Sequence, residues 1–180
     1  MGTELAKSTM SEIDLEYVVV KIGTEQYGIN IKYVDNITRL QKITRVPNVQ
    51  PYMQGVMNLR GEVVAVMSLR KKMGLPADEF TNSTRIIILK LNSQDEVGII
   101  VDEVKEVVNL EESEIEKVFY DVKDEKSSYI SGIGKHNGEL ISLLDIGAVI
   151  SDKVYLPFRI VSVISVVQSE SLYHFTVPPS

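Results

Sequence analysis

Short hydrophobic runs separated by polar turns dominate the chain from residue 17 to residue 144. The runs are rich in valine and isoleucine, and residues 18–20, 63–67 and 86–89 are entirely apolar. β-Branched side chains favour strands, and an unbroken apolar run predicts a strand that is largely buried. Many such strands, with turns about 8–12 residues apart, are typical of a β-barrel or a β-sandwich.

Helical signals are short and few. Residues 69–73 are followed by Gly74 and then by Pro76, which together predict the end of a short helix. Asp145 is a suitable N-cap and predicts one more helical turn, which extends to Ile150. We therefore expect an all-β fold with a few short helices.

Two parts of the chain resemble each other. Residues 52–69 and 129–146 align without gaps at an offset of 77 positions, and their apolar positions match. Four residue pairs are identical: Tyr52/Tyr129, Gly55/Gly132, Gly61/Gly138 and Glu62/Glu139. Residues 28–37 and 98–107 form a second pair at an offset of 70 positions. Two copies of one unit predict two similar subdomains rather than a solenoid, which needs three or more repeats.

We therefore predict two small barrels of about five strands each. The first covers about residues 15–83 and the second about residues 84–152. Each unit is too small to be stable alone, so we expect the two to pack together. Asn137–Gly138 predicts a tight hairpin turn in the second unit, and Arg60–Gly61 holds the same place in the first.

Composition narrows the possible functions. Of 180 residues, 44% are apolar and 24% charged, which excludes wholesale disorder. The 19 basic and 25 acidic side chains give a net charge of −6, which argues against a nucleic-acid binder or an anionic-membrane binder. Cysteine is absent, so disulfides, thiolate metal sites and a cysteine nucleophile are excluded.

The sequence carries no recognisable catalytic motif. Neither a phosphate-binding loop nor a nucleophile elbow occurs. We interpret His136 as a residue of an exposed hairpin, and His174 has no recognisable partners. Glu111–Glu116 lacks the spacing of a calcium loop and is expected to be a solvated face, while Arg70–Lys72 is interpreted as helix surface. We expect no catalytic residue, metal or cofactor, and apolar surfaces favour a binding module over an enzyme.

The two ends of the chain lie outside the duplicated units. Residues 1–14 are small or charged and predict a flexible N-terminus without a signal peptide. Residues 153–180 form a C-terminal extension whose apolar run, about 14 residues long, is short of the roughly 20 that cross a bilayer. The extension is expected to be an added strand, or a segment that packs on the body or on a neighbour.

One stretch carries a specific resemblance. It begins with Val46-Pro47-Asn48, continues through Tyr52 and Gly55-Val-Met-Asn-Leu-Arg-Gly61, and ends in an apolar strand followed by Ser68-Leu69-Arg70. This stretch resembles the hallmark of the CheW family of bacterial chemotaxis coupling proteins, although the family commonly has aspartate at the place of Ser68. The resemblance covers about residues 15–152.

The resemblance implies two five-stranded SH3-like β-barrels packed together. It also implies a non-catalytic adaptor that joins the cytoplasmic tips of methyl-accepting chemoreceptors to the regulatory domain of the histidine kinase CheA. Such an adaptor is cytoplasmic, associated with receptor arrays at the membrane, without membrane insertion or nucleic-acid binding. A free-standing regulatory module for another sensor kinase is the alternative.

The resemblance also implies where the partners bind. The receptor groove lies between the barrels, and each of its candidate residues could instead be a core side chain. These candidates are Val18, Ile31, Val34, Ile37, Leu91 and Val104. Asn58 and Arg60 are the kinase-binding candidates, and Arg60 could instead have a structural role in ordering its own loop. Many family members have a glutamate where this chain has Asn36, beside Asp35, so a pairing of Arg60 with that position stays open.

Overall fold

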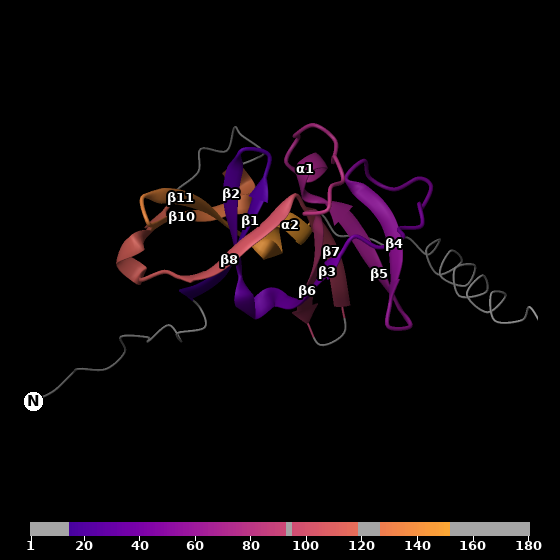
Figure 1. Ribbon diagram of the computed structural model, residues 1–180, viewed down its shortest axis with the longest axis horizontal. Helices are drawn as coiled ribbons and strands as arrows, with labels where there is room; N and C mark the ends of the chain where they lie inside the picture. The colour runs from indigo at the N-terminus through magenta and orange to yellow at the C-terminus, as the bar shows by residue number, and fades with distance from the viewer. Residues whose placement is uncertain (1–14, 93–94, 119–126, 152–180) are drawn as a thin grey trace, which may run out of the picture.

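In the computed structural model, the described residues are 15–92, 95–118 and 127–151, so the predictions for residues 1–14 and 153–180 lie outside them. Within these ranges the chain forms two β-sheets that lie side by side (Figure 1). The first has the strand order β8-β1-β2-β11-β10-β9 and the second the order β3-β6-β7-β5-β4.

The first sheet contains β1 (Glu16–Ile22), β2 (Glu25–Asn30), β8 (Glu103–Asn109), β9 (Ile115–Lys117), β10 (Ile130–His136) and β11 (Glu139–Leu144). The second contains β3 (Val34–Arg39), β4 (Met53–Leu59), β5 (Glu62–Ser68), β6 (Arg85–Asn92) and β7 (Asp95–Val101). The helices are α1 (Leu69–Lys72) and α2 (Ile146–Ser151), with 3-10 turns η2 (Ile31–Tyr33), η3 (Glu112–Glu114) and η4 (Ser127–Tyr129). The predicted fold class is confirmed, although one sheet has six strands because β9 is added.

The unbroken apolar runs are strands that are buried on both faces. On β1, Tyr17 and Val19 pack inside the first sheet, whereas Val18, Val20 and Ile22 pack between the two sheets. Strand β6 divides in the same way, with its even-numbered isoleucines inside the second sheet and Ile87 and Leu89 between the sheets. Each sheet therefore encloses a core of its own, and a third, larger core holds the two sheets together.

The two sheets do not follow the two halves of the chain. Strands β1 and β2 belong to the same sheet as β8–β11, and β6 and β7 belong to the same sheet as β3–β5. The predicted division between residues 83 and 84 is therefore wrong for the sheets. Each copy gives its first hairpin to the other copy, through the parallel pairs β2–β11 and β5–β7. Sequence similarity identifies equivalent strands but contains no information about which copy a strand pairs with.

The duplication itself extends to individual hydrogen bonds. The Ser68 amide donates to the Tyr52 carbonyl at 2.8 Å, and at an offset of 77 positions the Asp145 amide donates to the Tyr129 carbonyl at 2.8 Å. Each of these two polar residues also caps the helix that follows: Ser68 Oγ accepts from the amide of Lys71, and Asp145 Oδ1 from that of Ala148.

Backbone conformation confirms the two predicted hairpin turns. Arg60 and Gly61 have φ values of 54° and 88°, and Asn137 and Gly138 have values of 50° and 80°. Two consecutive residues with positive φ are the signature of a type I′ turn, which matches the right-handed twist of paired strands. His136, beside the second turn, is partly buried rather than exposed; it is the last residue of β10 and pairs with Glu139 of β11.

Candidate partner-binding surfaces

The edge strands β3 and β8 turn apolar side chains toward the seam between the sheets. On β3, Val34 pairs with Leu89 and Ile37 with Ile87, and both partners belong to the core between the sheets. On β8, Val104 pairs with Val20 and Val107 with Val18, again residues of that core. Because residues opposite each other share one face of a sheet, all four side chains point to the seam.

A β-bulge in each edge strand makes this arrangement possible. Residues three positions apart on a regular strand point to opposite faces. In β3 the pairing skips Asp35, because Val34 and Asn36 pair with consecutive residues of β6. In β8 it skips Lys105 at the equivalent place, because Val104 and Glu106 pair with consecutive residues of β1. An extra residue in the strand restores the common direction, so the residue before the bulge and the residue two positions after it lie on the same face.

Two of these side chains are unusually exposed for large apolar groups. The exposed fraction is 39% for Ile37 and 55% for Val107. Ile31, Val34, Leu91 and Val104 are partly buried and pack against the core between the sheets. We call these six residues the seam patch: Ile31, Val34, Ile37, Leu91, Val104 and Val107.

The seam patch contains five of the six residues expected to form the receptor groove. The exception is Val18, which is only 1% exposed and lies in the core beside Val107, so it supports the patch without reaching its surface. Val107 is the residue that sequence reasoning missed. The offset of 70 positions that relates the two copies makes it the counterpart of Ile37, and this signal was sufficient to find it.

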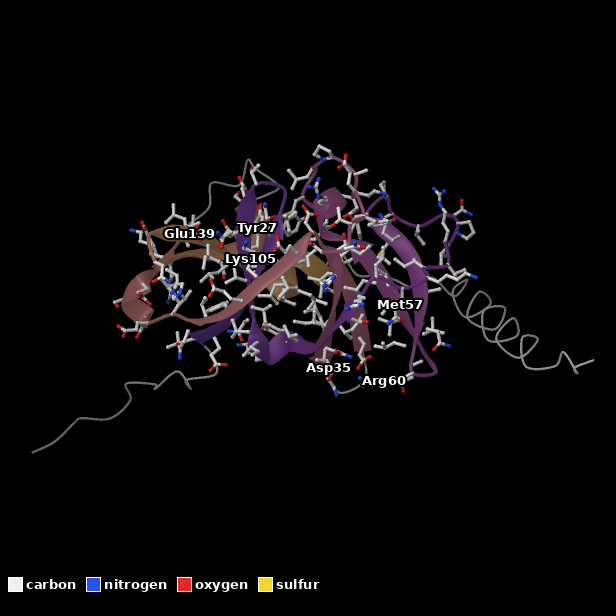
Figure 2. The ribbon with its side chains drawn as sticks, in the orientation of Figure 1. Tyr27, Asp35, Met57, Arg60, Lys105 and Glu139 are labelled. Atoms are coloured by element: carbon white, nitrogen blue, oxygen red, sulfur yellow. The ribbon has the colours of Figure 1, made fainter. Side chains whose placement is uncertain are left out.

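The residues expected to bind a kinase lie at the β4–β5 hairpin. Asn58 Oδ1 accepts a hydrogen bond from the Gly61 amide at 2.9 Å, so this side chain orders the turn. Arg60 is exposed and has no ion pair within the described part of the chain. Asn36 Oδ1 accepts from the neighbouring Ile37 amide, and no hydrogen bond joins Asn36 to Arg60 among the described residues. Figure 2 places Arg60 and Asp35 at the same end of the second sheet.

The sequence predicted that the basic run Arg70–Lys72, after β5, is helix surface. This prediction is wrong for Arg70 and Lys72, which are largely buried. Arg70 Nε and Nη2 donate to the two carboxylate oxygens of Asp102, each at 2.8 Å, and the Gly23 amide donates to Asp102 at 2.7 Å. Lys72 is 8% exposed, with its Nζ 4.2 Å from the ring centroid of Tyr52 and 5.4 Å from that of Tyr129. The local sequence could not predict this, because α1 is inserted where the two sheets meet.

The Arg70–Asp102 ion pair links the sheets at one point. Arg70 belongs to α1 next to the second sheet, Asp102 connects β7 to β8, and Gly23 lies in the β1–β2 turn of the first sheet. Burial alone raises the pKa of Asp102. The hydrogen bonds from Arg70 and Gly23, with the Arg70 charge, outweigh burial and hold the pKa below its ordinary value. The carboxylate therefore stays charged and keeps both partners in place.

The described residues contain no cluster of three or more histidine, aspartate or glutamate side chains that could hold a metal ion. Within the same ranges, no helix is both long and apolar enough to span a membrane.

The fold and its surfaces define a duplicated two-sheet β-domain, and a family model described as the CheW-like domain matches residues 16–154. The chain is 41% identical to "Chemotaxis protein CheW" of Bacillus subtilis over 133 residues, which cover 74% of this chain and 85% of that protein. It is 33% identical to the protein of the same name from Helicobacter pylori, with 77% and 83% covered.

A solved structure gives the same result. The scaffolding protein TtCheW of Thermoanaerobacter tengcongensis superposes with a TM-score of 0.67 at 29% identity, and covers 74% of this chain and 90% of its own. The chain belongs to the CheW family.

Proposed function

We propose that this chain is a non-catalytic adaptor that couples the cytoplasmic tips of chemoreceptors to the histidine kinase CheA. Its family and the scaffolding protein of similar structure support this proposal. The observation on which the proposal mainly rests is the pair of exposed apolar side chains, Ile37 and Val107, at equivalent places on two edge strands. The relatives are named chemotaxis proteins, which does not favour a regulatory module for another sensor kinase.

The seam patch is the proposed receptor surface. A helical partner presents apolar side chains at positions i, i+3, i+4 and i+7, and such a stripe needs an apolar surface to cover it. Ile37 and Val107 provide the exposed part of that surface, and the partly buried Val34 and Val104 lie beside them. The edge strands also carry the exposed charges Asp35, Arg39, Lys105 and Glu106. Charges on a sheet edge disfavour the addition of another strand, so packing of side chains is the favoured mode.

The proposed kinase surface is the β4–β5 hairpin. Asn58 holds the turn, and this leaves Arg60 exposed at its tip. A guanidinium group that has no ion pair among the described residues, as is the case for Arg60, is suited to a charged hydrogen bond with a carboxylate of another protein. Separate surfaces for receptor and kinase allow the adaptor to hold both at once, which raises their effective concentration at cytoplasmic receptor arrays.

The proposal is tested by separating the two binding activities. Ile37→Asp with Val107→Asp should abolish co-sedimentation with receptor-containing membranes and leave CheA pull-down intact. Arg60→Glu should weaken CheA pull-down and leave receptor co-sedimentation intact. Leu140→Asp is the matched control, because Leu140 is 62% exposed but lies on β11, outside the seam patch. If the patch variant stays folded and binds receptor like the control, the receptor surface is assigned wrongly.

A further inference from the structure

A second exposed apolar feature lies on the second sheet, away from the seam patch. Phe80, in the connection between α1 and β6, is 53% exposed. It borders two neighbouring hollows. The first has a volume of about 510 Å³ and is formed by Ile43, residues 45–51, the start of β4 and Lys71. The second is formed by Arg39, Leu40, Thr81, Asn82, Thr84 and Arg85. Single exposed apolar side chains are common on protein surfaces, so the exposure of Phe80 alone does not indicate a binding site. The residues around Phe80 provide the evidence for one.

Those surroundings are positively charged in an acidic protein. Arg39, Arg45, Lys71 and Arg85 line the two hollows, and no aspartate or glutamate lines either of them. Across the whole chain, acidic residues exceed basic ones by 25 to 19. Asp78 and Glu79 precede Phe80 in sequence. However, the Asp78 carboxylate accepts a hydrogen bond from the Ser68 hydroxyl, and both carboxylates interact electrostatically with Arg70.

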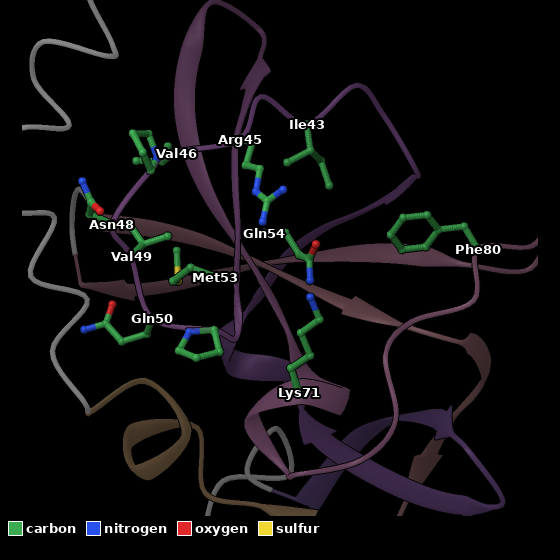
Figure 3. Close-up of a pocket in the computed structure, with 12 residues that line it drawn as sticks. Ile43, Arg45, Val46, Asn48, Val49, Gln50, Met53, Gln54, Lys71 and Phe80 are labelled. Atoms are coloured by element: carbon green, nitrogen blue, oxygen red, sulfur yellow. The ribbon is translucent and has the colours of Figure 1, made fainter.

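Three of the four cations have no partner within the described residues. Arg85 donates to the carbonyls of Asn82 and Thr84, at 2.7 and 2.8 Å. No hydrogen bond or ion pair occupies the side chains of Arg39, Arg45 or Lys71 in the described ranges. Figure 3 shows Arg45 and Lys71 extending toward Gln54 from opposite sides of the first hollow.

We infer that this surface, the Phe80 face, binds an acidic segment of a partner protein in which carboxylates flank one apolar side chain. The apolar side chain would pack against Phe80 and the first hollow, whose wall includes Val46, Val49 and Met53. The flanking carboxylates would accept charged hydrogen bonds from Arg45 and Lys71 on one side and Arg39 on the other, the chemistry by which arginine clusters recognise acidic motifs.

The Phe80 face is distinct from both surfaces of the proposed function. Its first hollow adjoins Met53 and Gln54 at the start of β4, whereas Asn58 and Arg60 lie at the opposite end of that strand. None of the seam-patch residues lines either hollow. A second copy of this chain is a less suitable occupant, because its exposed apolar side chains Val107 and Leu140 each follow a single exposed glutamate, Glu106 and Glu139, rather than lying between carboxylates.

The test uses the full chain and a fluorescein-labelled peptide with one phenylalanine between two triplets of glutamate. Fluorescence anisotropy should show saturable binding that weakens as salt is raised. The double variant Arg45→Glu, Lys71→Glu should weaken binding about tenfold or more, and Phe80→Ser should weaken it several-fold. Neither receptor nor kinase is present, so failure here is distinguishable from failure of the proposed function.

Controls separate the site from general charge. The double variant Lys105→Glu, Lys135→Glu makes the same charge change on the first sheet and should bind the peptide like the parent chain. A peptide with serine for phenylalanine should bind more weakly. Equal loss in the two double variants would overturn the inference, and so would tighter, Arg45-dependent binding of an RNA oligonucleotide. If circular dichroism shows a glutamate variant to be unfolded, Arg45→Gln with Lys71→Gln takes its place, and unchanged binding there refutes the site.

Discussion

Breaking the ion pair between Arg70 and Asp102 should loosen the junction of the two sheets. The pair has two hydrogen bonds of 2.8 Å, and its side chains are only 18% and 23% exposed. A two-fold charged hydrogen bond that is largely shielded from solvent is worth more than a surface ion pair, whose median is about 0–1 kcal/mol. We expect a coupling free energy of about 1–2 kcal/mol between the two side chains.

A double-mutant cycle of Arg70→Ala and Asp102→Asn measures this coupling through urea unfolding. The control cycle removes Lys105 and Glu103, whose Nζ and Oε1 atoms are 4.0 Å apart and whose side chains are 43% and 41% exposed. That second coupling energy should be close to zero. A coupling no larger in the Arg70 cycle than in the control cycle would refute the conclusion that the ion pair holds the sheets together.

The dependence on pH provides an independent measurement of the same interaction. The pKa of Asp102 lies below its ordinary value of 3.8 in the folded chain, so the unfolded chain takes up the proton first as pH falls. The stability that the pair contributes is therefore complete above the ordinary pKa, and it is lost as pH falls through the lowered folded value. The parent chain should lose more free energy of unfolding between neutral and acidic pH than Asp102→Asn, and parallel curves would contradict this.

Three further predictions concern the fold. Gly28→Ala and Gly98→Ala should each lower the free energy of unfolding by about 1–3 kcal/mol in urea titrations, because an added Cβ would lie 2.8 Å from Leu143 Cδ2 and 2.9 Å from Ile86 Cγ2 respectively; parental stability would contradict the packing. Residues 15–83 expressed alone should lack dispersed NMR signals, and a folded fragment would exclude the exchange of hairpins. Val18→Asp should unfold the chain, whereas Ile37→Asp should keep its melting temperature to within a few degrees, as circular dichroism can measure.

Some features of this protein followed from local sequence alone. β-Branched runs predicted strands, and Gly74 and Asp145 marked the ends of short helices. The Asn137–Gly138 dipeptide predicted a hairpin turn, and both residues have the positive φ values that such a turn needs. These signals depend on a residue and its close neighbours, so no tertiary information is needed to interpret them. The duplication was also visible in the sequence, because aligning two stretches needs no tertiary information. It extends to equivalent hydrogen bonds at Ser68 and Asp145.

Other features depended on contacts between distant residues. Which copy a strand pairs with, the burial of Arg70 and Lys72, and the bulges that turn Val107 toward the seam were decided by tertiary packing. The cations around Phe80 come together from separate segments in the same way. The sequence shows which side chains are apolar, but only the arrangement of both sheets determines whether each lies in a core or on the surface. Burial depends on all the neighbours of a side chain, and most of these are distant in sequence.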